Sequence, residues 1–247
     1  MAQLTIARVP AGEGMAWLKQ AWGVFKVAAI PWSGMTAAAF LAIMLAAQIP
    51  WVGKYLVELL SPLLVAGYMS ASRAAEEGQP VTFLHLGAGF REASRLQLLV
   101  VGGLYLLGVL LIDQIMRLLG GQGFQELLTL AQQPRNLSPE EAQAMLGAAL
   151  PALLLGMLLF TPLLMATWFA PALILFEAYK PGNAMWWSLW ACGVNWRPLL
   201  FYTSLLGLAA LPALLIPFGL GLLVFMPWAM ISTYAAYRGM FVPVEKP

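Results

Sequence analysis

The longest apolar stretch of the chain runs from Leu146 to Glu177 and reads LGAALPALLLGMLLFTPLLMATWFAPALILFE. It holds no charged residue before its last position. An α-helix needs about 20 apolar residues to cross the hydrocarbon layer of a bilayer. Helix is the expected structure, because an open strand in lipid would leave backbone groups without hydrogen-bond partners. The stretch therefore predicts a membrane helix that is too long to be one straight span.

A capping sequence precedes this stretch, and prolines interrupt it. Ser138 is the expected N-cap, Pro139 occupies the first turn, and Glu141 completes a capping box with Ser138. Proline removes a backbone donor and bends a helix. The candidate bends in the stretch are Pro151, Pro162 and Pro171.

The composition of the whole chain is that of a polytopic membrane protein. Of its 247 residues, 61% are hydrophobic and 10% are charged, against about 25% charged in a typical soluble domain. The net charge of +2 and the scattered basic residues argue against a nucleic-acid partner. Cys192 is the only cysteine, which excludes an intrachain disulfide and a CxxC metal site. No cleavable signal peptide is recognised, so the first apolar run is expected to be a retained insertion signal.

Six segments are apolar and long enough to span a membrane once tilt and bends are allowed. The spans are expected near Ala29–Gln48, Tyr55–Arg73, Leu96–Leu118, Leu146–Glu177, Pro198–Leu214 and Ile216–Arg238. A tight turn around Pro212 to Gly219 is expected to separate the last two. The outer loop at 119–138 is expected to hold a short surface helix that contains Phe124 and Leu127.

Three similar segments precede the odd-numbered spans. We call them lead segments: GEGMAWLKQAWG from Gly12, GQPVTFLHLGAG from Gly78, and GNAMWWSLWACG from Gly182. In each, an aromatic residue follows the first glycine by five positions, and a second glycine follows six positions later. The aligned aromatics are Trp17, Phe83 and Trp187. Chance similarity between glycine-rich segments is the alternative to a true repeat.

The even-numbered spans support the repeat, because each contains an internal proline that is expected to bend it: Pro62, Pro162 and Pro227. Arg73 and Arg238 both end their spans eleven residues after the proline, whereas the fourth span ends in Glu177. The predicted fold is all-α, with six transmembrane helices arranged as three parallel repeats. The repeat units are 12–77, 78–178 and 182–240, within one membrane domain that covers 1–247.

The lead segments are expected to lie at the cytoplasmic membrane surface, because tryptophan favours the headgroup layer. In the first segment, Met15, Leu18, Trp22 and Phe25 fall on one helical face. Plain anchoring is one interpretation, and docking of a partner or a lipid headgroup is the other. The candidate anchors and partner-contacting residues are Trp17, Trp22, Phe25, Phe83, Phe90, Trp186, Trp187 and Trp190.

Lysine and arginine concentrate on one side of the predicted topology. That side holds the N-terminal segment, the loops after the second and fourth spans, and the C-terminal tail. Short loops rich in Lys and Arg stay in the cytoplasm. The sequence therefore predicts a bacterial inner-membrane protein with both termini in the cytoplasm.

No set of residues with recognisable catalytic chemistry stands out. His85 is the only histidine, and no carboxylate lies at metal-ligand spacing from it. Charged residues lie at the ends of the spans, as with Asp113 and Arg117, which are spaced to pair along a helix. We expect no catalytic residues, no cofactor site and no metal site.

The second lead segment, with FLHLGAGF and SASRAAEEG, resembles an uncharacterised family of six-helix inner-membrane proteins from beta-proteobacteria. The resemblance spans nearly the whole chain. More distantly, the chain is similar to six-helix membrane domains fused to some glycerophosphodiester phosphodiesterases. The resemblance implies location and topology, and it transfers no catalytic residues.

Two functions remain open at this point. The first is a non-enzymatic accessory, scaffold or assembly component that contacts membrane lipids, with other membrane proteins or a second copy of the chain as candidate partners. The alternative is a transporter, flippase or permease for a lipid or small apolar molecule. Transport would need a cavity near the bilayer midplane, lined by polar groups such as Tyr68, Ser70, Thr161, Thr167 or Thr233.

Overall fold

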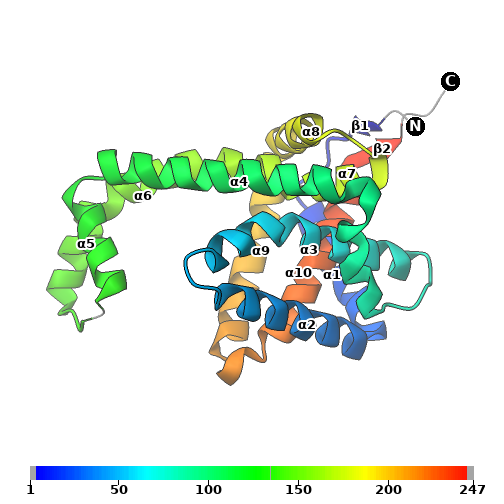
Figure 1. Ribbon diagram of the computed structural model, residues 1–247, viewed down its shortest axis with the longest axis horizontal. Coiled ribbons are helices and arrows are strands. Elements are labelled where there is room, and N and C mark those ends of the chain that lie inside the picture. The colour runs from blue at the N-terminus through cyan, green and yellow to red at the C-terminus, as the bar shows by residue number, and fades with distance from the viewer. Residues whose placement is uncertain (1–3, 134, 244–247) are drawn as a thin grey trace. The chain divides into compact units, whose positions relative to one another are not determined.

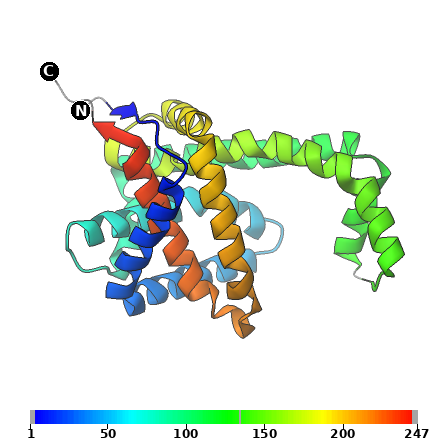
Figure 2. The same cartoon turned by 180° about the vertical axis from the view of Figure 1, so that it is seen from behind.

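The computed structural model describes residues 4–133 and 135–243, and these residues form two compact units. Of the described residues, the first unit combines 4–103 with 166–243, and the second holds 104–133 and 135–165. The long helices α4 (Glu92–Leu119) and α6 (Pro139–Trp168) each run from one unit into the other. Figures 1 and 2 show the course of the chain from two opposite sides.

The first unit contains most of the secondary structure. Its elements are β1 (Leu4–Ile6), α1 (Glu13–Val27), α2 (Ala29–Ala47), α3 (Gly53–Glu76), the 3-10 helix η1 (Phe83–Phe90), α7 (Ala170–Glu177), α8 (Pro181–Val194), α9 (Trp196–Leu215), the 3-10 helix η2 (Pro217–Gly219), α10 (Leu222–Met240) and β2 (Phe241–Pro243). The second unit adds α5 (Gly121–Gln132), which follows α4 and precedes α6 in the chain. The expected all-α class is confirmed, apart from one short pair of strands.

Five helical segments among the described residues are long and apolar enough to cross a membrane: Ala29–Ala47, Gly53–Glu76, Ala93–Leu119, Pro139–Glu177 and Trp196–Leu215. They coincide with the first five predicted spans. The sixth predicted span is also helical, as α10, but it is not among the five. Ser232, Thr233 and Tyr234 make α10 less apolar, and all three side chains are buried inside the protein.

The turn between the last two helices differs from the prediction. Pro212 lies inside α9, which continues to Leu215. The chain reverses later, through η2, where Phe218 and Gly219 adopt positive φ angles of 60° and 70°. Positive φ is accessible to glycine at little cost, and it allows a sharper reversal than the longer turn expected from Pro212.

The prolines expected to bend helices do not end them. Pro62, Pro162 and Pro227 all lie inside continuous helices, α3, α6 and α10. The long fourth segment breaks instead at Phe169, between α6 and α7, with Pro171 in the first turn of α7. Bending at the internal prolines remains a prediction.

The second unit bears out local predictions at both ends of the outer loop. The backbone N–H of Glu141 donates to Ser138 Oγ at 3.2 Å, and the Ser138 N–H donates to Glu141 Oε2 at 2.9 Å. This is the expected capping box, and α6 begins at Pro139, directly after Ser138. Arg117 Nε donates to Asp113 Oδ2 at 2.9 Å, as the helical spacing predicts. The expected surface helix is present as α5.

Two of the lead segments are α-helical, and the middle one is not. The first forms α1 and the third forms α8, whereas Phe83–Phe90 is a 3-10 helix. Close packing explains part of this difference, because η1 lies directly against α3. A Cβ atom on Gly67 of α3 would lie 2.7 Å from the Leu86 Cα atom.

Helix α1 packs against α9 and α10, and Figure 2 shows α1, in blue, crossing the red-to-orange α10 at an angle. Near its start, a Cβ atom on Gly14 would lie 3.0 Å from the backbone of Tyr202 in α9. Further along, the Trp228 indole of α10 donates to the Leu18 carbonyl at 2.9 Å. Its neighbours thus cover the α1 face that contains Gly14, Trp17, Leu18, Ala21 and Phe25.

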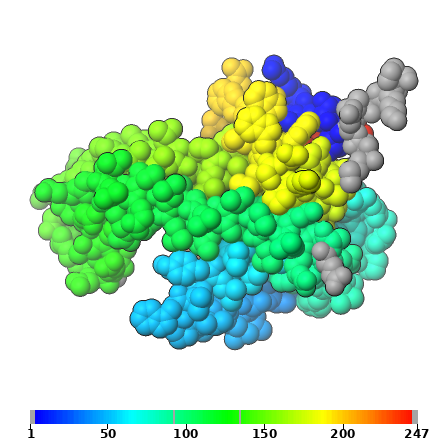
Figure 3. All heavy atoms as spheres, turned by 45° about the horizontal axis from the view of Figure 1, so that its top comes forward, coloured from blue at the N-terminus to red at the C-terminus, as the bar shows by residue number. Residues whose placement is uncertain are grey.

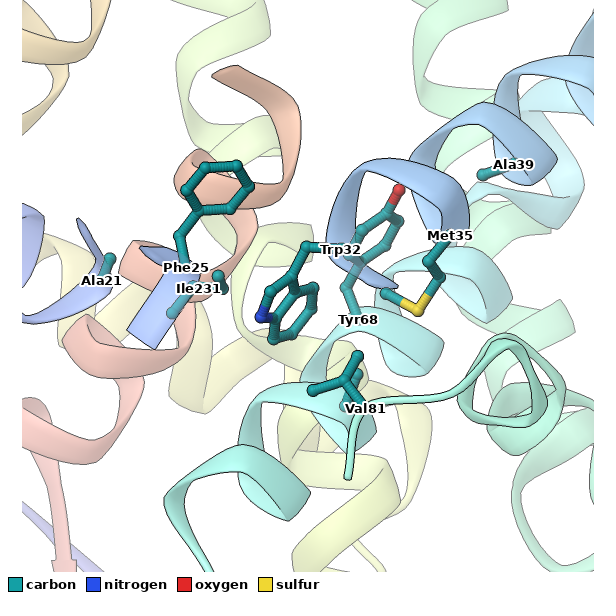
Figure 4. Packing of buried hydrophobic residues seen from close by; sticks show 9 residues of the cluster. Ala21, Phe25, Trp32, Met35, Ala39, Tyr68, Val81 and Ile231 are labelled. Atoms are coloured by element: carbon teal, nitrogen blue, oxygen red, sulfur yellow. The ribbon is translucent and has the colours of Figure 1, made fainter. Parts of the chain in front are cut away.

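A core cluster joins α1, α2, α3 and α10 (Figure 4). Trp32 and Met35 of α2 are fully buried, and they lie among Phe25, Tyr68 and Ile231. The Tyr68 ring belongs to this cluster, and its hydroxyl donates to Thr36 Oγ1 at 2.9 Å, which links α3 to α2. The core therefore joins segments from both ends of the chain.

The two short strands also join the ends of the chain. β1 pairs with β2 in antiparallel register, with Thr5 opposite Val242. The Asn195 amide holds the segment after β1, because it accepts from the Val9 N–H at 3.0 Å and donates to the Ala7 carbonyl at 3.0 Å. The N-terminal and C-terminal segments are therefore side by side.

Candidate functional site

The C-terminal ends of three helices, α3, α7 and α10, meet in the first unit and bring charged and aromatic side chains together. We call this group the helix-end cluster. Its members are Arg73 and Glu76 of α3, Phe176 and Glu177 of α7, and Tyr234, Tyr237 and Arg238 of α10. The sequence pointed to Arg73 and Arg238 as equivalent span ends and to Glu177 as the departing end of the fourth span, and the structure places all three in one cluster.

Hydrogen bonds connect the tyrosines of α10 to the carboxylates of the other two helices. Tyr234 Oη donates to Glu76 Oε2 at 2.7 Å, and Tyr237 Oη donates to Glu177 Oε1 at 3.3 Å. Arg238 Nε also lies 3.7 Å from Glu76 Oε2. Glu76 therefore receives a hydroxyl and a guanidinium from the same neighbouring helix.

The aromatic ring of Phe176 fills the centre of the cluster. Its centroid lies 6.0 Å from that of Tyr234 and 5.9 Å from that of Tyr237. The Arg73 guanidinium lies 5.0 Å from the Phe176 centroid, which is a cation–π distance. Arg73 also pairs with Glu77 at 3.0 Å. Opposite charges are thus balanced within the cluster.

Chemically, this arrangement holds three helices together. Hydroxyl donors face carboxylate acceptors, and each guanidinium has a carboxylate partner. Sequence reasoning missed Glu76, Phe176 and Tyr237. Helical spacing places Glu76 one turn after Arg73, but no local pattern indicates that α10 supplies its partners.

Two of the predicted anchors are wrong. Trp17 is only 3% exposed, and its ring lies edge-on to Tyr202 with centroids 5.7 Å apart. Phe25 is buried in the core cluster. These rings pack against protein instead of the headgroup layer, because α1 packs against α9 and α10. The apolar face of α1 is centred on Trp17, Leu18 and Ala21, not on Met15 and Trp22.

The other predicted anchors reach the surface, at separate places. Trp22 of α1 is 42% exposed, and Trp186 of α8 is 62% exposed and stacks on Trp190. Phe83 and Phe90 of η1 are exposed, and Trp187 is half-buried. The aligned positions Trp17, Phe83 and Trp187 therefore differ in burial. Anchoring by the exposed rings remains a prediction.

Two grooves border these surface aromatics. Trp186, Trp187 and Trp190 line a hollow of about 460 Å³ together with Thr5 and Ile6 of β1. Figure 3 shows the surface of α8, in yellow, beside the N-terminal segment in blue. A second groove of about 480 Å³ lies between α1, α9 and α10, and is lined by Met15, Leu18, Lys19, Trp22, Leu205 and Trp228.

The histidine and the cysteine both have structural surroundings. His85 Nδ1 accepts the Thr82 N–H at 3.1 Å and caps η1. Cys192 lies in α8, and burial raises the pKa of its thiol to about 12, which keeps it protonated at neutral pH. Among residues 4–133 and 135–243, no three His, Cys, Asp or Glu side chains gather as a metal site would require.

Comparison with known proteins gives one informative relative. The chain is 29% identical over 258 residues to a "Probable inner membrane protein" of Burkholderia thailandensis, covering 96% of this chain and 94% of the relative. No family model matches the chain, and no solved structure matches it. With five membrane-capable helices, this similarity supports a multi-pass integral protein of the inner membrane. The distant link to phosphodiesterase-fused domains remains an expectation.

Proposed function

We propose that this chain is a non-enzymatic scaffold or assembly component of an inner-membrane complex. One contrast carries the proposal. The charged and hydroxyl groups of the helix-end cluster are used for contacts within the protein, whereas tryptophans such as Trp186 and Trp190 are exposed. Exposed aromatic groups are typical of protein interfaces and of the membrane surface.

The packing of polar groups inside the first unit supports a scaffold over a transporter. Tyr68 and Thr233, two of the groups that could line a transport path, are buried. Tyr68 is bonded to Thr36, and Thr233 Oγ1 donates to the Ala229 carbonyl at 2.9 Å. Side chains that are buried and hydrogen-bonded between packed helices hold those helices together.

The paired termini support six spans with both ends in the cytoplasm. β1 and β2 are paired, which supports a topology in which residues 4–6 and 241–243 lie on one side of the membrane. A chain whose ends are on the same side crosses the membrane an even number of times. Five crossings would place β1 and β2 on opposite sides of the membrane, whereas a sixth crossing by α10 places them on the same side. Its polar residues fit this role because they face protein instead of lipid.

The contacts of the lead segments with neighbouring helices support three repeats. The segment η1 contacts α3, and α8 contacts α7, so each lies against the helix that precedes it in the chain. The segment α1 follows no earlier helix, and it lies against α10, the last one. The lead segment of the first repeat therefore packs against the last helix of the third repeat, as the other two lead segments pack against the last helix of the repeat before them.

A matching hydrogen bond in two hairpins adds to this support. Thr36 of α2 bonds to Tyr68 of α3, and Tyr202 of α9 bonds to Thr233 of α10. The two pairs occupy similar positions in their hairpins, with tyrosine and threonine exchanged. Tyr202 also bonds to Ser232 of α10 at 2.8 Å, so hydroxyl contacts join the two helices in both of these hairpins.

Membrane-impermeant thiol labelling tests the topology. In a Cys192→Ala background, Thr5→Cys and Val242→Cys should be labelled only when the cytoplasmic face is accessible. Phe218→Cys, at a turn residue that is 99% exposed, should be labelled only from the periplasm. Labelling of positions 5 and 218 from the same side would refute six crossings.

Crosslinking in nanodiscs tests the scaffold role. The full chain is purified gently and crosslinked, and partners or higher oligomers are identified by mass spectrometry. We expect a reproducible partner or oligomer that is lost in the double variant Trp186→Ala/Trp190→Ala. Trp51→Ala, which removes an exposed tryptophan from the α2–α3 turn, is the matched control and should retain it. A strictly solitary monomer would count against the proposal.

A further inference from the structure

The groove between α1, α9 and α10 combines an apolar floor with a cationic rim. Met15, Leu18, Leu205 and Trp228 supply apolar atoms, and Lys19 and Trp22 complete the lining. Leu205 lies at the middle of α9, which is one of the membrane-capable helices. The groove therefore opens beside a segment expected to lie among lipid chains.

Two hydrogen-bond donors at this groove lack protein acceptors. In the part of the chain that the structure describes, no carboxylate pairs with Lys19, and no acceptor bonds to the Trp22 indole N–H. By contrast, the neighbouring Trp228 indole donates to the Leu18 carbonyl. Lys19 and Trp22 are three residues apart on α1, so their side chains lie on the same face.

An unpaired ammonium beside a membrane helix needs an anion. Leaving a charge in an apolar layer without a partner is costly, and the membrane itself supplies anionic phosphates. A lipid phosphate can accept from both the ammonium and an indole N–H, while its hydrocarbon chain covers apolar side chains.

We propose that this groove binds one anionic phospholipid, with its phosphate at Lys19 and Trp22 and an acyl chain along Leu205 and Trp228. The binding is selective for headgroup charge, because the rim carries Lys19, which forms no ion pair with a carboxylate among residues 4–133 and 135–243. The site does not depend on the scaffold role, and a protein with or without partners can hold this lipid.

Native mass spectrometry of the full chain in zwitterionic micelles tests the site. Phosphatidylglycerol is titrated against phosphatidylcholine, and the first bound lipid is measured. We expect Lys19→Gln to weaken phosphatidylglycerol binding by about fivefold, the effect of one cation near a membrane surface. Lys26→Gln is the matched control, since it removes the same charge from α1 outside the groove. The affinity of this variant for phosphatidylglycerol should stay within about twofold of wild type.

A second variant tests the apolar part of the groove without changing charge. Leu205→Trp fills the groove beside Trp228. It should reduce binding of the first phosphatidylglycerol although the charge of Lys19 is unchanged. Circular dichroism and gel filtration of each variant establish that it is folded. Equal losses for Lys19→Gln and Lys26→Gln, or no loss for either, would overturn the site. Capture of a polypeptide by a photo-crosslinker at position 205 would also overturn it.

Discussion

Trp17→Ala is expected to lower the free energy of unfolding by about 3 kcal/mol, because it empties a buried site that surrounding helices cannot readily refill. Trp17 is almost completely buried, and its ring contacts Tyr202 of α9 edge-on. A Cβ atom on Gly239 of α10 would lie 2.9 Å from Trp17 Nε1. The ring therefore fills the space where α1, α9 and α10 meet. Reversible unfolding in mixed micelles, followed by circular dichroism, measures the change.

Trp22→Ala, on the same helix, is the control for this prediction. Its ring is 42% exposed, so truncation removes less packing, and we expect a loss of about 1 kcal/mol or less. The comparison separates a core tryptophan from a membrane anchor. A larger loss for Trp22→Ala than for Trp17→Ala would contradict the assignment of Trp17 to the core.

Gly67→Ala is expected to destabilise the protein by about 2 kcal/mol, the range for an overpacked core. In an exposed helix, replacing glycine by alanine stabilises by about 1 kcal/mol. At Gly67 the new Cβ atom would lie 2.7 Å from Leu86 Cα and 3.0 Å from the His85 carbonyl oxygen. These are backbone atoms of η1, which cannot rotate away, so α3 and η1 must separate. Unfolding in mixed micelles measures the net effect.

Gly23→Ala provides the matched change in a helix without a close neighbour. No atom lies within 4 Å of a Cβ atom built on Gly23 in α1. We expect this variant to be more stable than wild type by about 0.5–1 kcal/mol. Limited proteolysis between α3 and α4 should be faster in Gly67→Ala and unchanged in Gly23→Ala. Equal stabilities of the two variants would mean that η1 is not packed tightly against α3.

Local patterns in the sequence predicted most helices and several of their ends. The capping box at Ser138 and Glu141 was predictable because its partners are three residues apart. The same is true of the Asp113–Arg117 pair, whose partners are one turn apart. The turn before α10 lies inside the predicted range but begins later than expected, because positive φ at Phe218 depends on how α9 and α10 pack and has no clear local signal.

The candidate site was only partly predictable. Equal spacing after prolines pointed to Arg73 and Arg238 but could not reveal that Glu76 and Tyr234 bond to each other. These two residues are 158 positions apart in the chain. For the same reason the helical face of α1 was misassigned. Leu18 and Phe25 fit a face with either Trp17 or Trp22, and only the positions of α9 and α10 decide which ring is covered.

The sequence by itself determined that the chain enters a membrane and where its apolar helices lie. Both follow from the length and hydropathy of continuous segments. Such a segment forms a helix through hydrogen bonds within itself, and its apolar side chains favour transfer from water into the membrane. The tertiary structure alone decided which tryptophans are core and which are surface. It also decided that the helix ends join through tyrosine and carboxylate, and that β1 near one end of the chain pairs with β2 near the other. Those outcomes depend on which surfaces of distant segments come into contact, and hydropathy along the chain carries no information about such pairing.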